Sequence, residues 1–431
     1  MSYARTLDGL ARRRAERSVA AILGHGGWTS AAELRLRLDE RRAADLAGLR
    51  QMVAAQEELD WVCYGLYGLD RNPTTAPEQL EPFDPTLRPV ELELAVRDEA
   101  NRAAIARGED TTEIPTAWFT RHGWEPQTEL PGDVSAKLRA TVTHRRARIA
   151  AVPELALIEQ TTYKRRWYRP DHAAEEHQAM SAWLADRIEH ELSSRGGKPA
   201  SIAQLTAALE SDPRVHAVAE LITERKDYRL TDLVAELVTA DAVPEHPCHV
   251  YKATGLDKRA AWERTWDEQR KEDAGLPASP QVPPKYGQGD FLRPDYFRLR
   301  GKLDVPKERF IAFTEVPGRA AGELLYGWAG WTPAERVKAI LAMDEECEDQ
   351  GLALADRIAL LDSAWRLVPD VVRDDPTTGA RLKAELAALL GPDGPSKDLL
   401  ADWKKRFPPP GGRGKAKRMA PAQPVDEDDE D

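Results

Sequence analysis

The chain has 431 residues, of which 42% are hydrophobic, and a formal net charge of −12 at pH 7. This length is enough for two or three domains of about 150 residues each. No apolar run approaches the about 20 residues that cross a bilayer, and the N-terminus lacks the apolar core of a signal peptide, so we expect neither a membrane-spanning nor a secreted protein. Three widely separated cysteines, Cys63, Cys248 and Cys347, fit a reducing compartment and a cytoplasmic location.

The negative charge is unevenly distributed. Six of the twelve excess negative charges stand in a row at Asp426–Asp431. Between Lys285 and Arg309, by contrast, seven basic residues stand against four acidic ones. Because Lys and Arg neutralise DNA phosphates locally, the net charge of the whole chain does not exclude DNA contact.

Residues 1–70 predict a helical spacer. From Thr29 the leucines and valines recur at helical spacing, and Ser30 with Glu33 forms a capping box, so one long or once-broken helix is expected. The helix ends with Trp61, Tyr64 and Tyr67. Their rings either pack on one another or pack on the surface of a partner. Five prolines then forbid regular helix and predict a linker over 71–89.

Residues 90–248 predict a helical domain, possibly the target-recognition part. Its segment TTYKRRWYRP, residues 161–170, contains Lys164, Arg165, Arg166 and Trp167, a composition that suits phosphate contact and stacking on a base. The alternative is a helix entry whose rings belong to the core. Three short helices follow, with start signals at Ser201, Asp212 and Thr231. The third, LTDLVAELVTA, is apolar and acidic, which suits packing better than a major groove.

Residues 249–407 predict a small α+β domain. A helix over Lys258–Ala274 presents an ion-paired face around Trp262 and Trp266, which we expect to be buried. A strand follows at 309–316, and a Gly-Trp turn at 327–331 leads into a helix capped by Thr332 and Glu335. Residues 408–431 are low in complexity and predict a disordered tail. The expected fold class is therefore mainly α, multi-domain, with a small α+β C-terminal domain, a long N-terminal helix and a disordered tail.

The segment 293–309 is the strongest candidate for a functional surface. It gathers basic residues near two aromatic rings, and the predicted DNA-contacting residues are Tyr296, Arg298, Arg300, Lys302, Lys307 and Arg309. The alternative is that Arg300 and Lys307 pair with Asp304 and Glu308.

Other polar clusters predict no catalytic or metal site. His246, Cys248 and His249 crowd together without a fourth zinc ligand, so we interpret them as a strand entry with an exposed histidine pair. Asp393 followed by Asp402 and Lys404 resembles a nuclease pattern only faintly. Asp402 belongs to an expected helix, where solvated helix charges are the better interpretation.

Two segments carry a resemblance to a known family. YKATGLDKRAAWERTWDEQRKEDAG (251–275) and PPKYGQGDFLRPDYFRLRGKLDVPKERF (283–310) resemble the C-terminal domain of PglX-type adenine-specific DNA methyltransferases, from the phage growth limitation and type 2 BREX defence systems of bacteria. QMVAAQEELDWVCYGLYGL (51–69) resembles the helix that follows the catalytic domain in that family.

The catalytic motifs of such enzymes are absent from this sequence. An amino-methyltransferase needs a polar residue, two prolines and an aromatic ring in succession. Asn72-Pro73-Thr74, Val282–Lys285 and Phe407–Pro410 each lack the polar opener or the closing ring. Gly24–Gly27 predicts a turn before a helix rather than a methyl-donor loop, because Ala20 occupies the place where the preceding strand of such a loop has an acidic residue.

The resemblance implies a non-catalytic portion of such an enzyme. It would recognise double-stranded DNA and dock a separate catalytic domain, or other defence proteins, in a bacterial phage-defence system. S-adenosylmethionine is implied for that catalytic domain, and no cofactor, metal or membrane partner is expected for this chain. The alternative is a protein-interaction scaffold without DNA affinity, and an autonomous nuclease ranks last.

Overall fold

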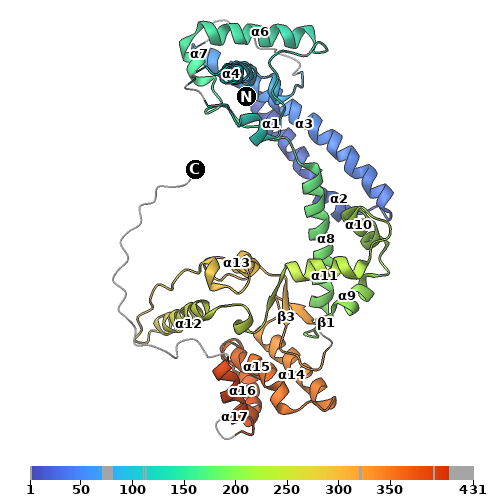
Figure 1. The fold of residues 1–431 in the computed structure, drawn as a ribbon, viewed down its shortest axis with the longest axis vertical. Helices are drawn as coiled ribbons and strands as arrows, with labels where there is room; N and C mark the ends of the chain where they lie inside the picture. Colours follow the sequence, from blue (N-terminus) through green and yellow to red (C-terminus); the bar gives the residue numbers. More distant parts are fainter. Residues whose placement is uncertain are drawn as a thin grey trace. The chain divides into compact units, whose positions relative to one another are not determined.

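A computed structural model of the chain describes residues 2–69, 81–109, 111, 114–319, 323–391 and 394–406. Within these residues the fold is mainly helical, with one small four-stranded sheet (Figure 1). This confirms the predicted fold class. The predicted tail at 408–431 and residues 71–80 of the predicted linker lie outside the described residues.

The chain divides into two compact units. The N-terminal unit comprises Met1–Trp183 and His216–Lys226, and the C-terminal unit comprises Leu184–Val215 and Asp227–Asp431. The N-terminal unit contains α1 (Ser2–Glu16), α2 (Val19–His25), α3 (Ala31–Leu66), η1 (Pro85–Leu87), α4 (Pro89–Ala106), α5 (Trp118–His122), α6 (Ala136–Ala151) and α7 (Pro153–Ile158). Two further helices, α8 (His172–Ser194) and α10 (Pro213–Thr223), have residues in both units.

The predicted N-terminal helix is confirmed as one unbroken helix, α3. The Ser30 hydroxyl accepts a hydrogen bond from the N–H of Glu33 at 3.3 Å, as the predicted capping box requires. The Glu33 carboxylate accepts a hydrogen bond from the N–H of Thr29 at 2.8 Å, whereas in a capping box it would accept one from the N–H of Ser30. Before this cap, Gly26 and Gly27 adopt positive φ angles of 67° and 76°, so the predicted turn over Gly24–Gly27 covers only its second half, and Gly24 and His25 belong to α2. The helix therefore begins where its local sequence places the start.

One face of α3 buries its apolar residues in the core of the N-terminal unit. Leu49 and Val53 pack in a cluster that also contains Phe83, Leu138 and Trp167. The loop before α4, helix α6 and the segment before α8 thus all converge on α3. Apolar burial of this kind contributes roughly 25 cal/mol per Å² removed from water, so α3 is the element that organises this unit.

The C-terminal unit combines the sheet with helices. Its elements are β1 (Ala200–Ser201), α9 (Ile202–Leu209), α11 (Leu230–Ala240), β2 (Ala242–Pro244), η2 (Pro247–His249), α12 (Ala253–Asp273), η3 (Gln288–Asp290), α13 (Pro294–Arg300), β3 (Phe310–Phe313), β4 (Leu325–Trp328), α14 (Pro333–Asp349), α15 (Leu354–Asp374), α16 (Pro376–Leu390) and α17 (Lys397–Arg406). The predicted capping boxes at Ser201 and Thr332 are confirmed at α9 and α14.

The strand order in the sheet is β1-β4-β3-β2. β4 pairs antiparallel with β1 and β3, whereas β2 runs parallel to β3, with Val243 opposite Ile311. The strand predicted at 309–316 is confirmed in part, because β3 covers Phe310–Phe313 and the residues after it are not in a strand. β1 and β2 precede residue 249, where the predicted α+β domain begins, yet they pair with strands that follow it. The predicted domain boundaries stay predictions.

Helices α14 to α17 pack together beside the sheet, and their apolar faces form the main core of the C-terminal unit (Figure 1). Between β4 and α14 two tryptophan rings close onto glycines. A Cβ atom on Gly327 would lie 2.3 Å from the ring of Trp331, and one on Gly330 would lie 2.3 Å from the ring of Trp328. Only glycine leaves room for both rings.

A second, smaller core lies around α12 and α13. Tyr251, Tyr286 and Phe291 pack ring against ring, with centroids 5.1–5.6 Å apart. Trp262 is half-buried and its indole N–H donates to the carbonyl of Pro284. The prediction that Trp266 is buried was wrong: its side chain is 53% exposed, because the loop after α12 covers only part of the helix.

Candidate nucleic-acid interface

Segment 161–170 contains both buried and exposed side chains. Lys164 and Trp167 point into the N-terminal unit and are buried. Arg165 and Arg166 are exposed, and so are the neighbours Tyr163, Tyr168 and Arg169. Lys164 and Trp167 therefore belong to the interior, as the alternative interpretation expected for the rings, and phosphate contact stays a prediction for Arg165 and Arg166.

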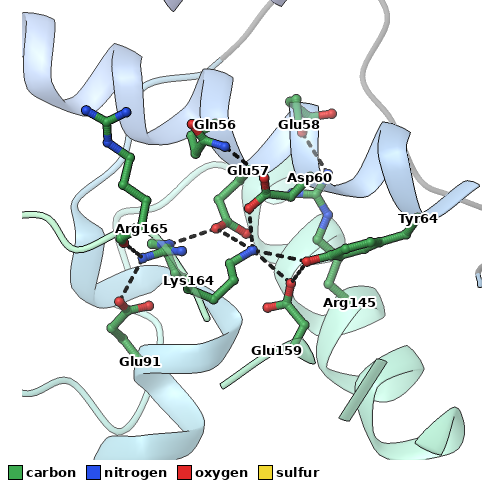
Figure 2. A network of polar contacts seen from close by, with 11 residues as sticks. Gln56, Glu57, Glu58, Asp60, Tyr64, Glu91, Arg145, Glu159, Lys164 and Arg165 are labelled. Atoms are coloured by element: carbon green, nitrogen blue, oxygen red, sulfur yellow. Dashed lines mark hydrogen bonds and ion pairs between the residues drawn. The ribbon is translucent and has the colours of Figure 1, made fainter. Parts of the chain in front are cut away.

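Lys164 lies inside a cage of carboxylates (Figure 2). Its Nζ is 2.6 Å from Asp60 Oδ2, 2.8 Å from Glu159 Oε1 and 3.3 Å from Glu57 Oε1. The hydroxyl of Tyr64 donates to the same Glu159 oxygen at 2.6 Å. Because its ammonium is buried and shared among carboxylates, Lys164 belongs to the interior of the protein and is not part of the surface considered below.

Arg88 ties this cage to the backbone of the segment. Its guanidinium donates to Glu57 Oε1 at 2.7 Å, to Glu91 Oε1 at 2.9 Å and to the carbonyl oxygen of Arg165 at 3.0 Å. A neighbouring buried pair, Arg145 with Glu58, is 2.9 Å apart (Figure 2). The network thus fixes the backbone on which the exposed arginines stand.

Burial and the neighbouring positive charges have opposite effects on the pKa values of these carboxylates. Burial raises the pKa of Glu57, but the charges of Lys164 and Arg88 outweigh it and bring that pKa down to about 2. For Glu91 burial dominates over the attraction of Arg88 and raises the pKa to about 7. Burial likewise raises the pKa of Glu159 despite Lys164. The cage therefore holds both an ionised carboxylate and carboxyls that take up protons readily.

The outer side of the segment carries rings and guanidinium groups. Arg165 lies over the ring of Trp167, 4.8 Å from its centroid. The ring of Tyr168 lies on His122, with centroids 4.6 Å apart, and His122 in turn contacts Trp118 at 4.2 Å. Sequence reasoning missed these residues because they lie on another helix, α5, and carry no motif.

The second predicted segment, 293–309, also contains both side chains that are buried or ion-paired and side chains that are exposed. Tyr296 is buried under the guanidinium of Arg293. Arg300 pairs with Glu308 at 2.6 Å and Asp304 at 3.7 Å, as the alternative interpretation expected for Arg300.

Arg309 also lies among acidic groups, because Asp186, Glu189 and Asp241 surround its guanidinium. Arg298 is exposed beside Asp241, at 3.7 Å. These two arginines are already partly neutralised within the unit.

Three exposed lysines of this region lack an acidic partner among the described residues: Lys285, Lys302 and Lys307. They lie near one another, because the N–H of Tyr286 donates to the carbonyl of Lys302, and the Nζ of Lys307 approaches Gly301. We call Lys285, Arg298, Lys302 and Lys307 the basic face. Lys285 was missed as a site residue because it precedes the segment that contains the arginines.

The histidine cluster is part of a buried network. His246 is buried and lies 3.1 Å from Asp362 Oδ2, so the prediction of an exposed histidine pair was wrong. The N–H of Cys248 donates to His246 Nδ1 at 3.2 Å, which leaves the proton of that ring on the nitrogen that faces Asp362. Burial raises the pKa of the Cys248 thiol to about 12, so it is no nucleophile.

Neither metal nor nuclease chemistry finds support among the described residues. No group of three or more His, Cys, Asp or Glu side chains is placed to hold a metal ion in this part of the chain. Asp402 is exposed on α17 and pairs with Lys405, whereas Asp393 lies outside the described residues. None of the described helices has the length and the apolar stretch needed to cross a bilayer.

A cavity of about 440 Å³ lies between α1, α2 and α3, lined in part by Arg37, Arg41 and Glu40. Two of its cations have partners: Arg37 donates to the carbonyl oxygens of Gly26 and Gly27, and Arg41 donates to Glu175.

Comparison with known proteins places the chain among methyltransferase relatives. The family model described as Domain of unknown function (DUF7008) matches residues 52–409. The chain is also 38% identical over 346 residues to the adenine-specific methyltransferase PglX of Streptomyces coelicolor, which confirms the predicted resemblance. The match covers 78% of this chain and only 27% of that relative. No solved structure matches the chain.

Proposed function

This chain belongs to the DUF7008 family, and from that membership and the similarity to PglX we propose that it is a non-catalytic portion of an adenine-specific DNA methyltransferase. In this proposal it contacts double-stranded DNA and docks a separate catalytic domain, within a bacterial phage-defence system. That catalytic domain would bind S-adenosylmethionine and methylate the adenine. The role of this chain is to hold the duplex in position.

The basic face carries the proposal. Lys302 and Lys307 are exposed, lie on the short loop after α13 and have no acidic partner among the described residues. Free ammonium groups on a fixed loop neutralise phosphates without reading the base sequence, which is the electrostatic part of duplex binding. Arg298 contributes less, because its guanidinium donates to the carbonyl of Ala240 at 3.0 Å and lies 3.7 Å from Asp241.

The buried members of the predicted site hold this face in place. Asp304 accepts hydrogen bonds from the hydroxyls of Tyr251 and Tyr286 and lies near Arg300. The loop of residues 301–307 is thereby tied to the aromatic core around α12. Lysines on a tethered loop lose less conformational entropy on binding than lysines on a mobile one.

An apolar surface beside α12 favours the docking role. Trp266 is 53% exposed, and Val282, in the loop that returns along α12, is 96% exposed. The loop is held there because Thr265 donates to the carbonyl of Gln281. Aromatic side chains are enriched at protein–protein contacts, so the exposed Trp266 favours, as the second candidate function, a scaffold that docks the catalytic domain without touching DNA.

Fluorescence anisotropy with a labelled random 20-base-pair duplex tests the first candidate. We expect binding that weakens log-linearly with salt, and for Lys302→Ala with Lys307→Ala a salt slope smaller by about two units. Arg381→Ala with Lys383→Ala is the matched control, because it removes two exposed cations from α16 of the same unit. Equal losses in both double variants would remove the basic face from the proposal, and no binding of the wild-type chain at low salt would leave only the scaffold function.

A further inference from the structure

A second basic surface, in the N-terminal unit, has a different chemistry from the basic face. We call it the arginine–tyrosine face, and it consists of Arg121, Tyr163, Arg165, Arg166, Tyr168 and Arg169. All six side chains are exposed, and none of the four guanidinium groups forms an ion pair with an acidic group among the described residues. Here the exposed cations stand between exposed aromatic rings.

The two rings are available to a ligand. Tyr163 is 67% exposed and Tyr168 is 55% exposed. One side of Tyr168 is occupied by His122, whose ring is held because its Nδ1 lies 2.6 Å from the carbonyl oxygen of Trp118. The tilted ring contacts of Trp118 with His122 and of His122 with Tyr168 therefore hold the tyrosine ring in place.

The backbone beneath these side chains is anchored at three successive points. The carbonyl of Arg165 accepts from Arg88, the carbonyl of Trp167 accepts from the indole N–H of Trp124 at 2.8 Å, and the N–H of Arg169 donates to the carbonyl of His122 at 2.9 Å. This last bond places Arg169 beside the end of α5, next to Arg121. The face is thus prepared before any ligand binds, which reduces the entropy that binding costs.

Exposed rings between arginines suit unpaired nucleotides better than a duplex. The bases of a duplex are stacked on one another, so their flat faces are not accessible to a tyrosine ring on the outside. Unpaired bases offer those faces, and stacking on an aromatic side chain contributes about 1–3 kcal/mol per base while arginines follow the phosphates. On the basic face, by contrast, Tyr296 is buried and free lysines predominate.

We infer that the arginine–tyrosine face binds a single strand of DNA, with bases stacked on Tyr163 and Tyr168 and phosphates contacted by the arginines. The inference rests on the proposed function only in taking DNA as the ligand. It assigns the single strand to the N-terminal unit and the duplex to the basic face of the C-terminal unit.

The test uses the full chain and two labelled probes, a single-stranded 20-mer of thymidines and a 20-base-pair duplex, in fluorescence-anisotropy titrations. We expect Tyr163→Ala with Tyr168→Ala to weaken binding of the single strand by tenfold or more and to leave the duplex unchanged. Tyr163→Phe with Tyr168→Phe retains both rings and should bind like the wild type. Arg165→Ala with Arg166→Ala and Arg169→Ala should reduce the single-strand salt slope by about two units.

The controls separate the two hypotheses. Tyr67→Ala with Arg97→Ala removes an exposed ring and an exposed cation elsewhere in the N-terminal unit and should change neither titration. If the wild-type chain binds the duplex but not the single strand, the inference fails and the proposed function stands. If it binds the single strand alone, the proposed function fails and the inference stands. An equal loss for both probes in the tyrosine-to-alanine variant would also overturn the inference.

Discussion

The ammonium of Lys164 lies 2.6 Å from the carboxylate of Asp60, 104 residues earlier in the chain, and is buried. Two residues further along, Arg166 is exposed and has no acidic partner among the described residues. Two cations of one short segment thus have opposite roles. Lys164 holds the segment to α3, and Arg166 belongs to the surface that we assign to DNA.

Substitution of these two residues should separate stability from binding. Lys164→Ala leaves buried carboxylates without their counter-charge, and we expect it to lower the free energy of unfolding by about 3–5 kcal/mol. Arg166→Ala should change it by less than about 0.5 kcal/mol, because an exposed side chain is removed. Urea titration at pH 7, followed by circular dichroism, measures both. Similar unfolding midpoints for the two variants would contradict the assignment of Lys164 to the interior.

Glu91 predicts a pH dependence of stability with a definite sign. Burial raises its pKa to about 7 in the folded protein, above its ordinary value of 4.5, so the folded state binds the proton more tightly than the unfolded state. The resulting contribution is favourable at low pH and is lost as the pH rises from about 4.5 to about 7. Glu91→Gln removes this loss. Its stability relative to the wild type should increase by up to about 1.4 kcal/mol per pH unit in that window.

The measurement is a urea titration of both proteins at several pH values between 4.5 and 8. Glu93→Gln is the control on the same helix, because Glu93 is partly exposed and pairs with Arg146 at the surface. A difference between the wild type and Glu91→Gln that stays constant across the window would show that Glu91 titrates normally.

Local signals in the sequence predicted the helices well. The capping residues Ser30, Ser201 and Thr332 mark helix starts in the structure as in the sequence, because a cap depends only on residues three positions away. The sheet was only partly predictable. β1 and β2 have two and three residues and acquire their partners from beyond residue 309, so no local alternation marks them.

The candidate site shows the same limit. Composition identified segment 161–170, but the inward direction of Lys164 depends on Glu57 and Asp60, about 100 residues away. Trp262 and Trp266 share a helical face by their spacing, and that spacing predicted burial for both. Only contacts with the following loop distinguish them, and those contacts are not encoded in the periodicity of α12.

The rings of Trp328 and Trp331 lie against Gly330 and Gly327 and leave no room for a side chain at either position. Gly330→Ala would place a Cβ atom 2.3 Å from the Trp328 ring, so the turn between β4 and α14 must shift. We expect a loss of about 1–3 kcal/mol in the free energy of unfolding, the range for overpacking a well-packed core. Gly289→Ala is the matched control, because nothing lies within 4 Å of a Cβ atom there. Thermal unfolding followed by tryptophan fluorescence distinguishes them, and equal melting temperatures would show that the turn adapts.

Asp362 predicts a larger effect in the core of the C-terminal unit. Its Oδ2 atom accepts from Arg366 at 2.8 Å, and from Trp403 at 3.2 Å, and lies 3.1 Å from His246, so one carboxylate joins η2, α15 and α17. Burial raises the pKa of Asp362, but the hydrogen bond with His246 and the charge of Arg366 outweigh it and bring that pKa down to about 2.

The sign for Asp362 is therefore opposite to that for Glu91. Its contribution to stability is present above the ordinary pKa of 3.8 and is lost as the pH falls towards 2. Asp362→Asn removes the charge while keeping the shape, and we expect it to lower the free energy of unfolding at pH 7 by about 3–5 kcal/mol. Asp370→Asn is the control on the same helix and should cost less than about 0.5 kcal/mol, because among the described residues Asp370 pairs with Arg373 alone, at the surface. If the two variants unfold at the same urea concentration, the carboxylate of Asp362 is not what holds α17 to η2, and apolar packing around Trp403 alone accounts for that contact.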